Sequence, residues 1–586
     1  MRMLVFIVLA WLPGILQAGN WPQWRGPSAM GVSDETDLPT RWDSNGNIVW
    51  KVQIKGLGAS TPIIWDKRIF ITGQDGSGPV NIGFRPGNVD SHEGESVTFI
   101  VKCLSTEDGS TLWEKRLPAE GPLPPVHSMH NLASPSCVTD GERVVAWFGT
   151  GQVFCFDLEG NPLWKRHIGK EVSPFDLRWA HGSSPLIHGK FLYLLCDHNT
   201  AAYLLAIDKT NGKTEWKVDR GKEMRSYSTP FIFEADGRKE LIVNSNPGLD
   251  AYDPDTGKHL WRAGSSCRVP VSIPVAADGI LYASRGDRSG PYMAIRGGGS
   301  GDVTETHTLW KVSTGASYVS SPLLYQGLLY FSTENGIVRC VDPADGKTVW
   351  MERVQGKFWS SPVAADGHIF LLAESGQTVV LKAGRKVELV ARNSLGEKAI
   401  ASPAISSNSI FIRSEKHLYR IGDKGDTITE LPANATGAVA GGQERSESGR
   451  AGGAGGQRSG RGSRRGGFDP SQWRQRAMDR LKSGLRCSDE EWKKIEPTIS
   501  RIQELRSSLR PPRRWGGGGE PDPLREKLTQ LAASDAPGDE ALSNALKEFR
   551  NRRNAIESKI AQEREKLKKL VTPRQEASLI LQEYLD

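Results

Sequence analysis

The sequence predicts an all-β, eight-bladed propeller followed by a separate, small all-α domain. A repeat of roughly 40–50 residues occurs eight times between Ile48 and Ile421, and each copy contains four short hydrophobic segments. Each copy opens on a leading proline, which in most copies directly follows serine or threonine, and most copies close on tryptophan. Beyond about residue 470 the alternating patterns end and helical spacing replaces them.

Two landmark residues align the copies. The leading prolines are Pro62, Pro135, Pro185, Pro230, Pro274, Pro322, Pro362 and Pro403. The tryptophans of the fourth segment are Trp50, Trp113, Trp164, Trp216, Trp261, Trp310 and Trp350, with a degenerate eighth near Leu389. A tryptophan at this place can lie flat between neighbouring blades and supply much of their contact. We therefore interpret these tryptophans as structural.

The third copy shows how one blade is built. We expect its strands at 184–188, 191–196, 203–208 and 215–218. The turn before the last strand contains Gly212. Since glycine readily adopts the positive φ that a tight hairpin requires, this turn is expected to join the third and fourth strands. This copy therefore predicts a four-stranded antiparallel sheet.

The ring is predicted to close through an N-terminal strand. The eighth copy, residues 402–421, has no tryptophan strand after it, whereas the segment 48–52 around Trp50 precedes the first leading proline. Inserting that segment as the outer strand of the last blade leaves no large sheet edge exposed. In the fifth copy Ala294 lies sixteen residues before Trp310 instead of ten, and we interpret 297–301 as a longer surface turn.

The first 18 residues have the layout of a secretory signal peptide. Arg2 precedes the apolar run 4–12, and the stretch ends on small residues that favour cleavage after Ala18. The run is too short to span the ~30 Å of a bilayer's hydrocarbon core, and no cysteine follows it for lipid attachment. We expect an exported protein of the periplasm or the extracellular space, not lipidated and without a transmembrane segment.

The chain divides into five predicted regions. They are a signal peptide at 1–18, an N-terminal extension at 19–47, the propeller at 48–423, a flexible Gly/Arg/Ser-rich linker at 424–469 and a helical domain at 470–586. The linker has almost no large apolar residues and cannot pack. It also holds much of the net charge of +7, since residues 437–467 contain six arginines and two glutamates.

The seven cysteines do not form an evident disulfide framework. Cys103 and Cys340 lie ten residues before the tryptophan of their copy, where Ala206 and Ala251 stand in other copies, and Cys155 takes the same place with one residue fewer. Cysteine packs as a small apolar residue there. No two cysteines are adjacent, and the remaining four show no pairing pattern.

The repeat resembles that of the quinoprotein-type propellers, the family of pyrroloquinoline-quinone dehydrogenases. The pattern Ser-Ser-Pro, Gly-x-Leu-Tyr, Asp-x-x-x-Gly-Lys-x-x-Trp is closer to the non-catalytic branch, which includes the propeller lipoprotein of the bacterial outer-membrane assembly machine. Residues 21–27, Trp-Pro-Gln-Trp-Arg-Gly-Pro, resemble the opening of exported members of that branch. The resemblance covers roughly residues 20–423 and implies the fold more strongly than an activity.

The same resemblance implies where binding residues lie. In that family the loops that lead into each inner strand cross the funnel-shaped face of the ring. The candidate binding residues on this funnel face are His130, Asn131, Trp179, His181, Arg225, Tyr227, Arg268, Tyr318, Lys357 and Trp359, with Phe358 and Lys398 beside them. Loops between second and third strands are expected to add Asp197, His198, Arg285, Asp287, Glu334 and Glu374.

These candidates favour binding over catalysis. A quinone dehydrogenase holds calcium through carboxylate and amide oxygens and needs a carboxylate base, and the sequence shows no cluster with that spacing. We expect no enzyme and no cofactor. The alternative is a pyrroloquinoline-quinone-dependent oxidoreductase with degenerate motifs that uses the quinone with calcium.

Four histidines offer a weaker metal hypothesis. His127, His130, His181 and His198 come from two neighbouring copies, but zinc requires three or four ligands in tetrahedral array. Satisfied polar loop residues are the preferred interpretation, so no metal site is predicted. Arginine and aromatic side chains dominate binding hot spots. The predicted function is therefore an exported scaffold that binds envelope proteins or extended peptides, and the export signal argues against a nucleic-acid partner.

The C-terminal region is predicted to form helices. Ser488 and Glu491 form a capping box ahead of an apolar stripe, a short helix follows at 524–532, and a long charged helix spans 540–570. Residues 570–575 resemble the Leu-Thr-x-x-Gln motif of periplasmic stress chaperones and metal sensors, with Val571 inserted. A structural hairpin or dimerisation arm is the preferred interpretation, and a chaperone or an envelope stress or metal sensor is the alternative.

Overall fold

The computed structural model describes two compact units, residues Met1–Gly442 and Gln443–Asp586. The described residues are 19–43, 46–78, 80–81, 89–90, 96–127, 129–177, 179–222, 224–286, 290–422, 429–431, 478, 482, 485, 487–509, 539–573, 575–576 and 579. The predicted linker therefore lies outside the described residues, except for 429–431 at its start. None of the helices within the described residues is long and apolar enough to cross a bilayer.

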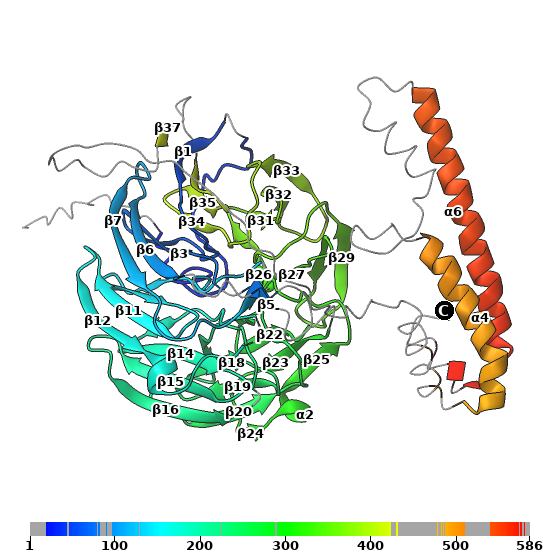
Figure 1. The fold of residues 1–586 in the computed structure, drawn as a ribbon, viewed down its shortest axis with the longest axis horizontal. Helices are drawn as coiled ribbons and strands as arrows, with labels where there is room; N and C mark the ends of the chain where they lie inside the picture. Colours follow the sequence, from blue (N-terminus) through cyan, green and yellow to red (C-terminus); the bar gives the residue numbers. More distant parts are fainter. Residues whose placement is uncertain are drawn as a thin grey trace, which may run out of the picture. The chain divides into compact units, whose positions relative to one another are not determined.

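The first unit is an eight-bladed propeller, as the sequence predicts, with its sheets arranged as sectors of a closed ring (Figure 1). Blade 1 contains β2 (Ile63–Trp65), β3 (Arg68–Asp75), β6 (Thr98–Ser105) and β7 (Thr111–Pro118), and blade 2 contains β9 (Val138–Thr139), β10 (Arg143–Trp147), β11 (Gln152–Asp157) and β12 (Pro162–His167). Blade 3 contains β13 (Leu186–His188), β14 (Phe191–Asp197), β15 (Ala202–Asp208) and β16 (Thr214–Gly221), and blade 4 contains β17 (Phe231–Ala235), β18 (Arg238–Asn244), β19 (Leu249–Tyr252) and β20 (His259–Ala263).

The remaining blades complete the ring. Blade 5 contains β21 (Val275–Ala277), β22 (Ile280–Ser284), β23 (Tyr292–Arg296) and β25 (Thr308–Val312), and blade 6 contains β26 (Leu323–Tyr325), β27 (Leu328–Ser332), β28 (Ile337–Val341) and β29 (Thr348–Arg353). Blade 7 contains β30 (Val363–Ala365), β31 (His368–Leu372), β32 (Gln377–Lys382) and β33 (Leu389–Ser394), and blade 8 contains β34 (Ala404–Ser406), β35 (Ser409–Arg413), β36 (His417–Gly422), β1 (Ile48–Gln53) and β37 (Thr429–Leu431). A small sheet of β4 (Val80–Asn81), β5 (Val89–Asp90) and β8 (Val126–His127) and the single-turn helix α1 (Ile168–Glu171) lie in connections.

The N-terminal strand closes the ring. Strand β1 pairs antiparallel with β36, from Ile48 opposite Ile421 to Gln53 opposite His417. Trp50 then donates from Nε1 to the carbonyl oxygen of Thr106 in blade 1 at 2.9 Å. The last blade is thus bonded to the first by the N-terminal strand, and the predicted closure of the ring is confirmed.

Five of the other tryptophans join neighbouring blades in the same way, whereas the buried Trp261 donates to Glu240 Oε2 within its own blade at 2.9 Å. Trp113 of blade 1 donates from Nε1 to Leu158 O of blade 2 at 2.9 Å, and a Cβ on Gly160 (φ 86°) would lie 2.7 Å from the Trp113 ring. Equivalent bonds join Trp164 to Lys209, Trp216 to Pro254, Trp310 to Pro343 and Trp350 to Gly384. The structural interpretation of these tryptophans is confirmed.

The predicted packing role of three cysteines is also confirmed. Cys103, Cys155 and Cys340 are buried and pair in register with Trp113, Trp164 and Trp350, respectively. Burial raises the pKa of each thiol to about 12. No disulfide bond joins the cysteines of the described residues.

Blade 2 departs from the predicted alignment. Seven inner strands start directly after a leading proline, but β9 starts at Val138, three residues after Pro135. In blade 2 Cys137 occupies the position that proline occupies in the other blades. Ser136 before it is equivalent to Thr61 of blade 1 and Ser184 of blade 3. Pro135 therefore lies two residues ahead of the place assigned to it from the sequence.

Blade 7 also has no tryptophan of its own. The partner of Val380 in β33 is Ala391, so Ala391, two residues after Leu389, stands in the tryptophan position. Trp42 of the N-terminal extension fills the space instead, because it is 5% exposed and stacks on Phe370 with ring centroids 6.4 Å apart. The extension is therefore part of the propeller core.

The fifth copy's inserted segment is not simply a surface turn. Residues 301–302 form β24 (Gly301–Asp302), which pairs parallel with the outer strand of blade 4, and α2 (Thr304–His307) follows it. Val303 is buried between the two. The insertion therefore adds a fifth strand to blade 4.

The second unit contains a helical hairpin. Helix α4 (Asp489–Leu509) packs on α6 (Asp539–Lys568) around Ile495, Ile499, Ile502 and Leu567, all at most 1% exposed. The predicted short helix at 524–532 and the side chains of Ile580, Leu581 and Leu585 lie outside the described residues.

Two capping boxes are present in this unit, the predicted one at Ser488 and Glu491 and a second one at Thr572 and Gln575. Glu491 N donates to Ser488 Oγ at 3.2 Å while Ser488 N donates to Glu491 Oε2 at 2.9 Å. Thr572 N donates to Gln575 Oε1 at 3.0 Å, and Gln575 N donates to Thr572 Oγ1 at 3.4 Å. These caps satisfy backbone N–H groups that a helix start leaves without partners.

Candidate functional site at the propeller axis

In seven blades the residue two positions before the inner strand is serine or threonine, and these residues build a ring of hydroxyl groups around the axis. In one arc Thr61 N donates to Ser136 Oγ, Ser136 N to Ser184 Oγ and Ser184 N to Thr229 Oγ1, at 2.9–3.0 Å. In the other arc Ile273 N donates to Ser321 Oγ, Ser321 N to Ser361 Oγ and Ser361 N to Ser402 Oγ, each at 3.0 Å. We call Thr61, Ser136, Ser184, Thr229, Ser321, Ser361 and Ser402 the hydroxyl ring. Each of these bonds joins neighbouring blades, which explains the serine and threonine of the repeat.

A second ring lies on the side of the loops that lead into the inner strands. Its members stand two positions before the hydroxyl-ring position of each blade: Ala59, Ser134, Gly182, Tyr227, Val271, Val319, Trp359 and Ile400. We call these residues the upper ring. They come from all eight blades, and the largest are Tyr227 and Trp359.

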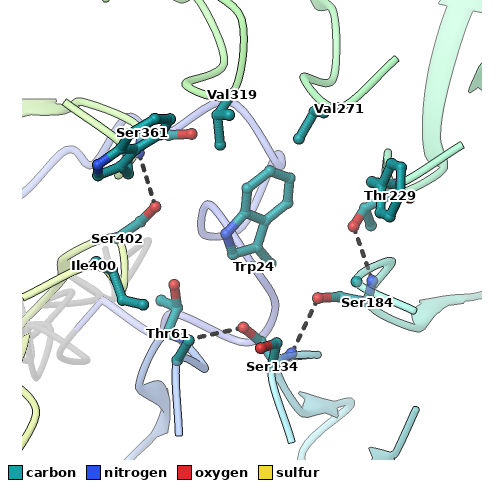
Figure 2. Close-up of a pocket in the computed structure, with 15 residues that line it drawn as sticks. Trp24, Thr61, Ser134, Ser184, Thr229, Val271, Val319, Ser361, Ile400 and Ser402 are labelled. Atoms are coloured by element: carbon teal, nitrogen blue, oxygen red, sulfur yellow. Dashed lines mark hydrogen bonds between the residues drawn. The ribbon is translucent and has the colours of Figure 1, made fainter. Parts of the chain in front are cut away.

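The N-terminal extension closes the axis from the opposite side. Trp21 pairs with Ile64 through both backbone groups, at 2.8 and 2.9 Å, and Thr139 N donates to Pro22 O at 2.9 Å. These contacts lie beyond the hydroxyl ring along strands β2 and β9. From there Trp24 projects into the axis, and its indole lies at the centre of the ring of labelled residues in Figure 2.

A buried arginine holds this segment in place. Arg25 donates from Nε to Ala29 O at 3.2 Å, and from its second terminal nitrogen to Met30 O and Pro322 O at 2.6 and 2.7 Å. Burial lowers its pKa to about 9. Three residues of the Trp-Pro-Gln-Trp-Arg-Gly-Pro stretch thus have structural roles. Trp21 is buried, Trp24 fills the axis, and Arg25 bonds the extension to blade 6 through Pro322 O.

Between Trp24 and the upper ring lies a cavity of about 130 Å³. Six members of the hydroxyl ring line it, namely all except Ser321. None of these six hydroxyls donates a hydrogen bond to another described residue, and five of them already accept a backbone N–H, as Figure 2 shows for several. The cavity wall therefore offers hydroxyl protons, flanked by Trp359 and Tyr227.

Aromatic side chains continue from this cavity onto the funnel face. Trp179 packs against Tyr227 with ring centroids 5.9 Å apart and ring planes tilted by 34°, and it meets His127 edge-on at 6.3 Å. On the other side, Trp359 Nε1 donates to Glu374 Oε2 at 3.1 Å, and Lys357 Nζ lies 3.9 Å from the same oxygen. Trp179, Tyr227, Trp359 and Lys357, all predicted, thus line or border the axial opening.

The exposed charges next to the upper ring are cationic. Arg225, Lys357 and Lys398 stand two positions before Tyr227, Trp359 and Ile400, and Arg268 stands three before Val271. All four are exposed, and among the described residues Arg225, Arg268 and Lys398 form no ion pair. Arg225 donates from Nε to Asn199 Oδ1 at 2.7 Å.

Several predicted funnel residues are buried instead. His181 and His198 are fully buried with Nε2 of His198 3.4 Å from Nδ1 of His181, inside a cage formed by Trp147 and Phe175. Burial lowers the pKa of both rings, to about 3 for His198. The predicted role of His181 as an exposed contact residue is therefore wrong, because aromatic rings enclose it.

Three further candidates act within the protein. Asn131 is buried and its Oδ1 accepts Ala133 N at 3.0 Å, which shapes its own loop. Arg285, 2% exposed, donates to the carbonyl oxygens of Ser245, Asn246 and Ser265. Phe358 is buried in the core between blades 6 and 7.

Asp197 belongs to an ion network between blades 3 and 4. Its Oδ1 accepts Arg220 Nε at 2.8 Å, and Arg220 also reaches Asp250 at 3.1 Å. Both carboxylates are fully buried. Asp197 is therefore not available on the funnel face.

The other candidates stay at the surface. His130 is half-buried on the loop before β9, and burial together with His127 lowers its pKa to about 4. Tyr318 is half-buried, Glu334 lies on a described loop, and Asp287 lies outside the described residues.

The axial residues do not fit a calcium-held quinone. The described residues around the cavity include hydroxyl, aliphatic and aromatic groups but no carboxylate or side-chain amide, and calcium requires such oxygens. The cavity is also smaller than the roughly 300–1,000 Å³ of small-molecule sites. Within the described part of the chain no cluster of three or more His, Cys, Asp or Glu side chains has the arrangement of a metal site.

Sequence reasoning missed the hydroxyl ring, Trp24 and Trp42. The signal for the ring was present, since Ser or Thr precedes most of the leading prolines. Trp24 and Trp42 carry no repeat signal, because they lie outside the repeats. Only the path of the extension across the ring brings them to the axis and to blade 7.

Comparison with known proteins agrees with this architecture. A family model described as "Outer membrane protein assembly factor BamB" matches residues 98–352, 299–388 and 334–431. The outer membrane protein assembly factor BamB of Salmonella typhimurium is 29% identical over 313 residues, which cover 47% of this chain and 65% of that protein. A tetrathionate hydrolase of Acidianus ambivalens is 28% identical over 130 residues, 19% of this chain and 24% of that protein. The chain spans less than two thirds of either relative.

Among solved structures, the quinohemoprotein alcohol dehydrogenase of Comamonas testosteroni has a TM-score of 0.50 at 10% identity, covering 70% of this chain and 82% of that one. This similarity concerns the fold alone.

Proposed function

Because this chain belongs to the PQQ-like propeller family described as outer membrane protein assembly factor BamB, we propose that it is an exported, non-catalytic scaffold. It binds envelope proteins or extended peptides at the funnel face. The observation that carries the proposal is the combination of an aromatic-walled axial cavity with unpaired cations beside it. Arginine and aromatic side chains are the groups that dominate binding hot spots.

The charge pattern of the funnel face favours an anionic partner. Two carboxylates of that face are engaged inside the protein, Glu374 by Trp359 and Asp197 by Arg220, whereas Arg225, Arg268 and Lys398 are exposed without an ion pair among the described residues. Exposed charges steer association and set specificity, and salt screens them over about 8–10 Å. Binding at this face should therefore weaken as ionic strength rises.

The test compares the funnel face with another surface. Immobilised full-length protein is incubated with envelope extract, and the bound proteins are identified by mass spectrometry. The double variant Arg225→Ala/Lys398→Ala should lose the bound partner. The control Lys165→Ala/Lys213→Ala also removes two exposed cations, but from the outer strand and turn of blades 2 and 3, and it should retain the partner. Equal retention by both variants would move the binding site away from the funnel.

The alternative is an oxidoreductase that uses pyrroloquinoline quinone with calcium, the function that the resemblance of the repeat to quinoprotein dehydrogenases implies. Adding the quinone and calcium to purified protein separates the two functions. The scaffold proposal expects no bound-cofactor absorption band, since the cavity wall has no calcium ligands. A stoichiometric band would overturn it.

A second part of the proposal concerns the helical unit. Its hairpin core and two capping boxes support a structural or dimerisation role. Comparing the mass of the full chain with that of a chain ending before residue 470, by light scattering, tests dimerisation.

A further inference from the structure

We propose that the axial cavity binds the C-terminal carboxylate of an extended peptide. This inference deepens the proposed function, on which it rests, by naming the chemical group that enters the cavity. It stands on the hydroxyl ring, on Trp24 and on the charge around the opening, each of which is an independent observation.

The first observation is the state of the hydroxyl ring. Ser136, Ser184, Thr229, Ser361 and Ser402 each accept a backbone N–H through Oγ, so that the hydroxyl proton remains for another acceptor. The Thr61 hydroxyl has no hydrogen bond to any described residue. A set of converging hydroxyl donors favours a ligand that only accepts hydrogen bonds, and an ionised carboxylate is such a group.

The second observation is the floor of the cavity. Trp24 lies at its centre, and no described residue accepts a hydrogen bond from its indole N–H. An indole N–H is a donor only. The floor thus adds a further donor to those of the wall, and it stops a peptide from passing through the ring.

The third observation is the balance of charge. The described residues of the cavity wall carry no carboxylate, and four cationic side chains, Arg225, Arg268, Lys357 and Lys398, are exposed beside the upper ring. A cation would meet neither an anionic ligand in the wall nor a favourable potential at the opening. An anion is favoured at both.

The fourth observation is size and shape. The cavity of about 130 Å³ is small for a complete ligand, but it accommodates a carboxylate with a small part of the chain that bears it. The aromatic surface of Tyr227, Trp179 and Trp359 then lies where the preceding residues of a peptide would pass. A terminal carboxylate on an extended chain uses both parts of the site, whereas a free small anion uses only the cavity.

The experiment measures fluorescence anisotropy of full-length protein with fluorescein-labelled pentapeptides whose last two positions are randomised. One pool has a free C-terminal carboxylate and the matched pool ends in an amide. The carboxylate pool should bind at least about tenfold more tightly, since hydrogen bonds to a charged group contribute more than those to a neutral one. Millimolar acetate and phosphate, added as competitors, test the alternative of a free anion.

Two variants and one control locate the effect. Thr61→Val keeps the shape of the side chain and removes the hydroxyl, and Trp24→Phe removes the indole N–H. Together they should bring binding of the carboxylate pool to the level of the amide pool. Thr378→Val makes the same change at a buried threonine in β32, outside the cavity wall, and should leave binding unchanged. Thermal melting confirms that each variant is folded. If the Trp24 variant unfolds, Thr61→Val by itself serves as the test and should reduce binding of the carboxylate pool.

The outcomes distinguish this inference from the proposed function. Equal binding of both pools at a site that needs Arg225 and Lys398 overturns the carboxylate inference and leaves the funnel scaffold standing. Preference for acetate or phosphate over the carboxylate pool also overturns it. If neither pool binds while partner capture still depends on Arg225 and Lys398, that result rejects the carboxylate inference and leaves the funnel scaffold standing. Failure of both pools and of that capture rejects both proposals.

Discussion

Trp42 stacks on Phe370 at a centroid distance of 6.4 Å, although 328 residues of chain separate them. In blades 6 and 8 the equivalent rings, Tyr330 and Phe411, lie 6.0 Å from Trp350 and Trp50. The extension thus replaces the tryptophan that blade 7 lacks. Its backbone is fixed there as well, because Trp42 N donates to Asn393 Oδ1 at 3.1 Å and Asn393 Nδ2 donates to Thr40 O at 3.0 Å.

Replacing Trp42 by alanine should destabilise the propeller strongly. Removing a buried aromatic side chain costs about 3–5 kcal/mol. Urea unfolding followed by circular dichroism measures the loss. Trp42→Phe is the matched control, because the buried Nε1 of Trp42 has no hydrogen-bond partner to lose. A Trp42→Ala variant as stable as the control would show that the extension does not support blade 7.

The buried ion network should tolerate the loss of a pair better than the loss of one member. Arg220 bonds Asp197 and Asp250, and burial, which outweighs the attraction of Arg220, raises the pKa of Asp197. Arg220→Met leaves the buried Asp197 carboxylate uncompensated and should cost about 3–5 kcal/mol in unfolding free energy. Arg220→Met/Asp197→Leu should recover most of this loss, since Asp250 keeps Arg262 at 2.7 Å.

A double variant as unstable as the single one would contradict this account. Urea denaturation at neutral pH gives both values under the same conditions. The comparison is informative because the two variants share the Arg220 substitution and differ only in the remaining buried charge.

Stability should fall as the pH decreases below about 6.5, because histidines whose pKa is lowered by burial, among them His181 and His198, resist protonation in the folded state. Burial lowers the pKa of His181 and His198 in the folded state, to about 3 for His198. Between pH 6.5 and the folded-state pKa the unfolded chain binds more protons than the folded one, so acid favours unfolding. Each histidine should contribute about 1.4 kcal/mol per pH unit to the decline.

Urea unfolding at pH 7.5, 6 and 5 measures this slope. His198→Leu should reduce it by the share of one histidine. His307→Gln, at a half-exposed position on α2, should leave it unchanged. An identical slope in the His198 variant would show that another group controls the acid response.

The first capping box of the helical unit should contribute measurably to its stability. Ser488→Ala removes the acceptor of Glu491 N and should cost about 1 kcal/mol. Ser500→Ala, at an exposed mid-helix position, is the control and should cost nothing, because alanine favours helix. Thermal unfolding of the full chain at 222 nm compares the two, and equal effects would assign no role to the cap.

Much of the architecture was predictable because it is encoded locally and eight times. Three features recur at regular spacing: the four-strand copy, the tryptophan of its last strand and the small residue opposite that tryptophan. The strand around Trp50 could therefore be assigned to the vacant outer position of the last blade. The two capping boxes are local too, since each involves residues three positions apart. Repetition let one blade be inferred from another.

The site depended on tertiary structure. The exposure of His181 and Asp197 could not be read from their loops, because Phe175 and Trp147 cover the first and Arg220 pairs with the second. Trp24 and Trp42 lie in a segment with no periodicity, and only its path across the closed ring brings one to the axis and the other to Phe370. Local sequence therefore specified the blades, whereas the packing of distant segments decided what fills the axis and which side chains remain open to a partner.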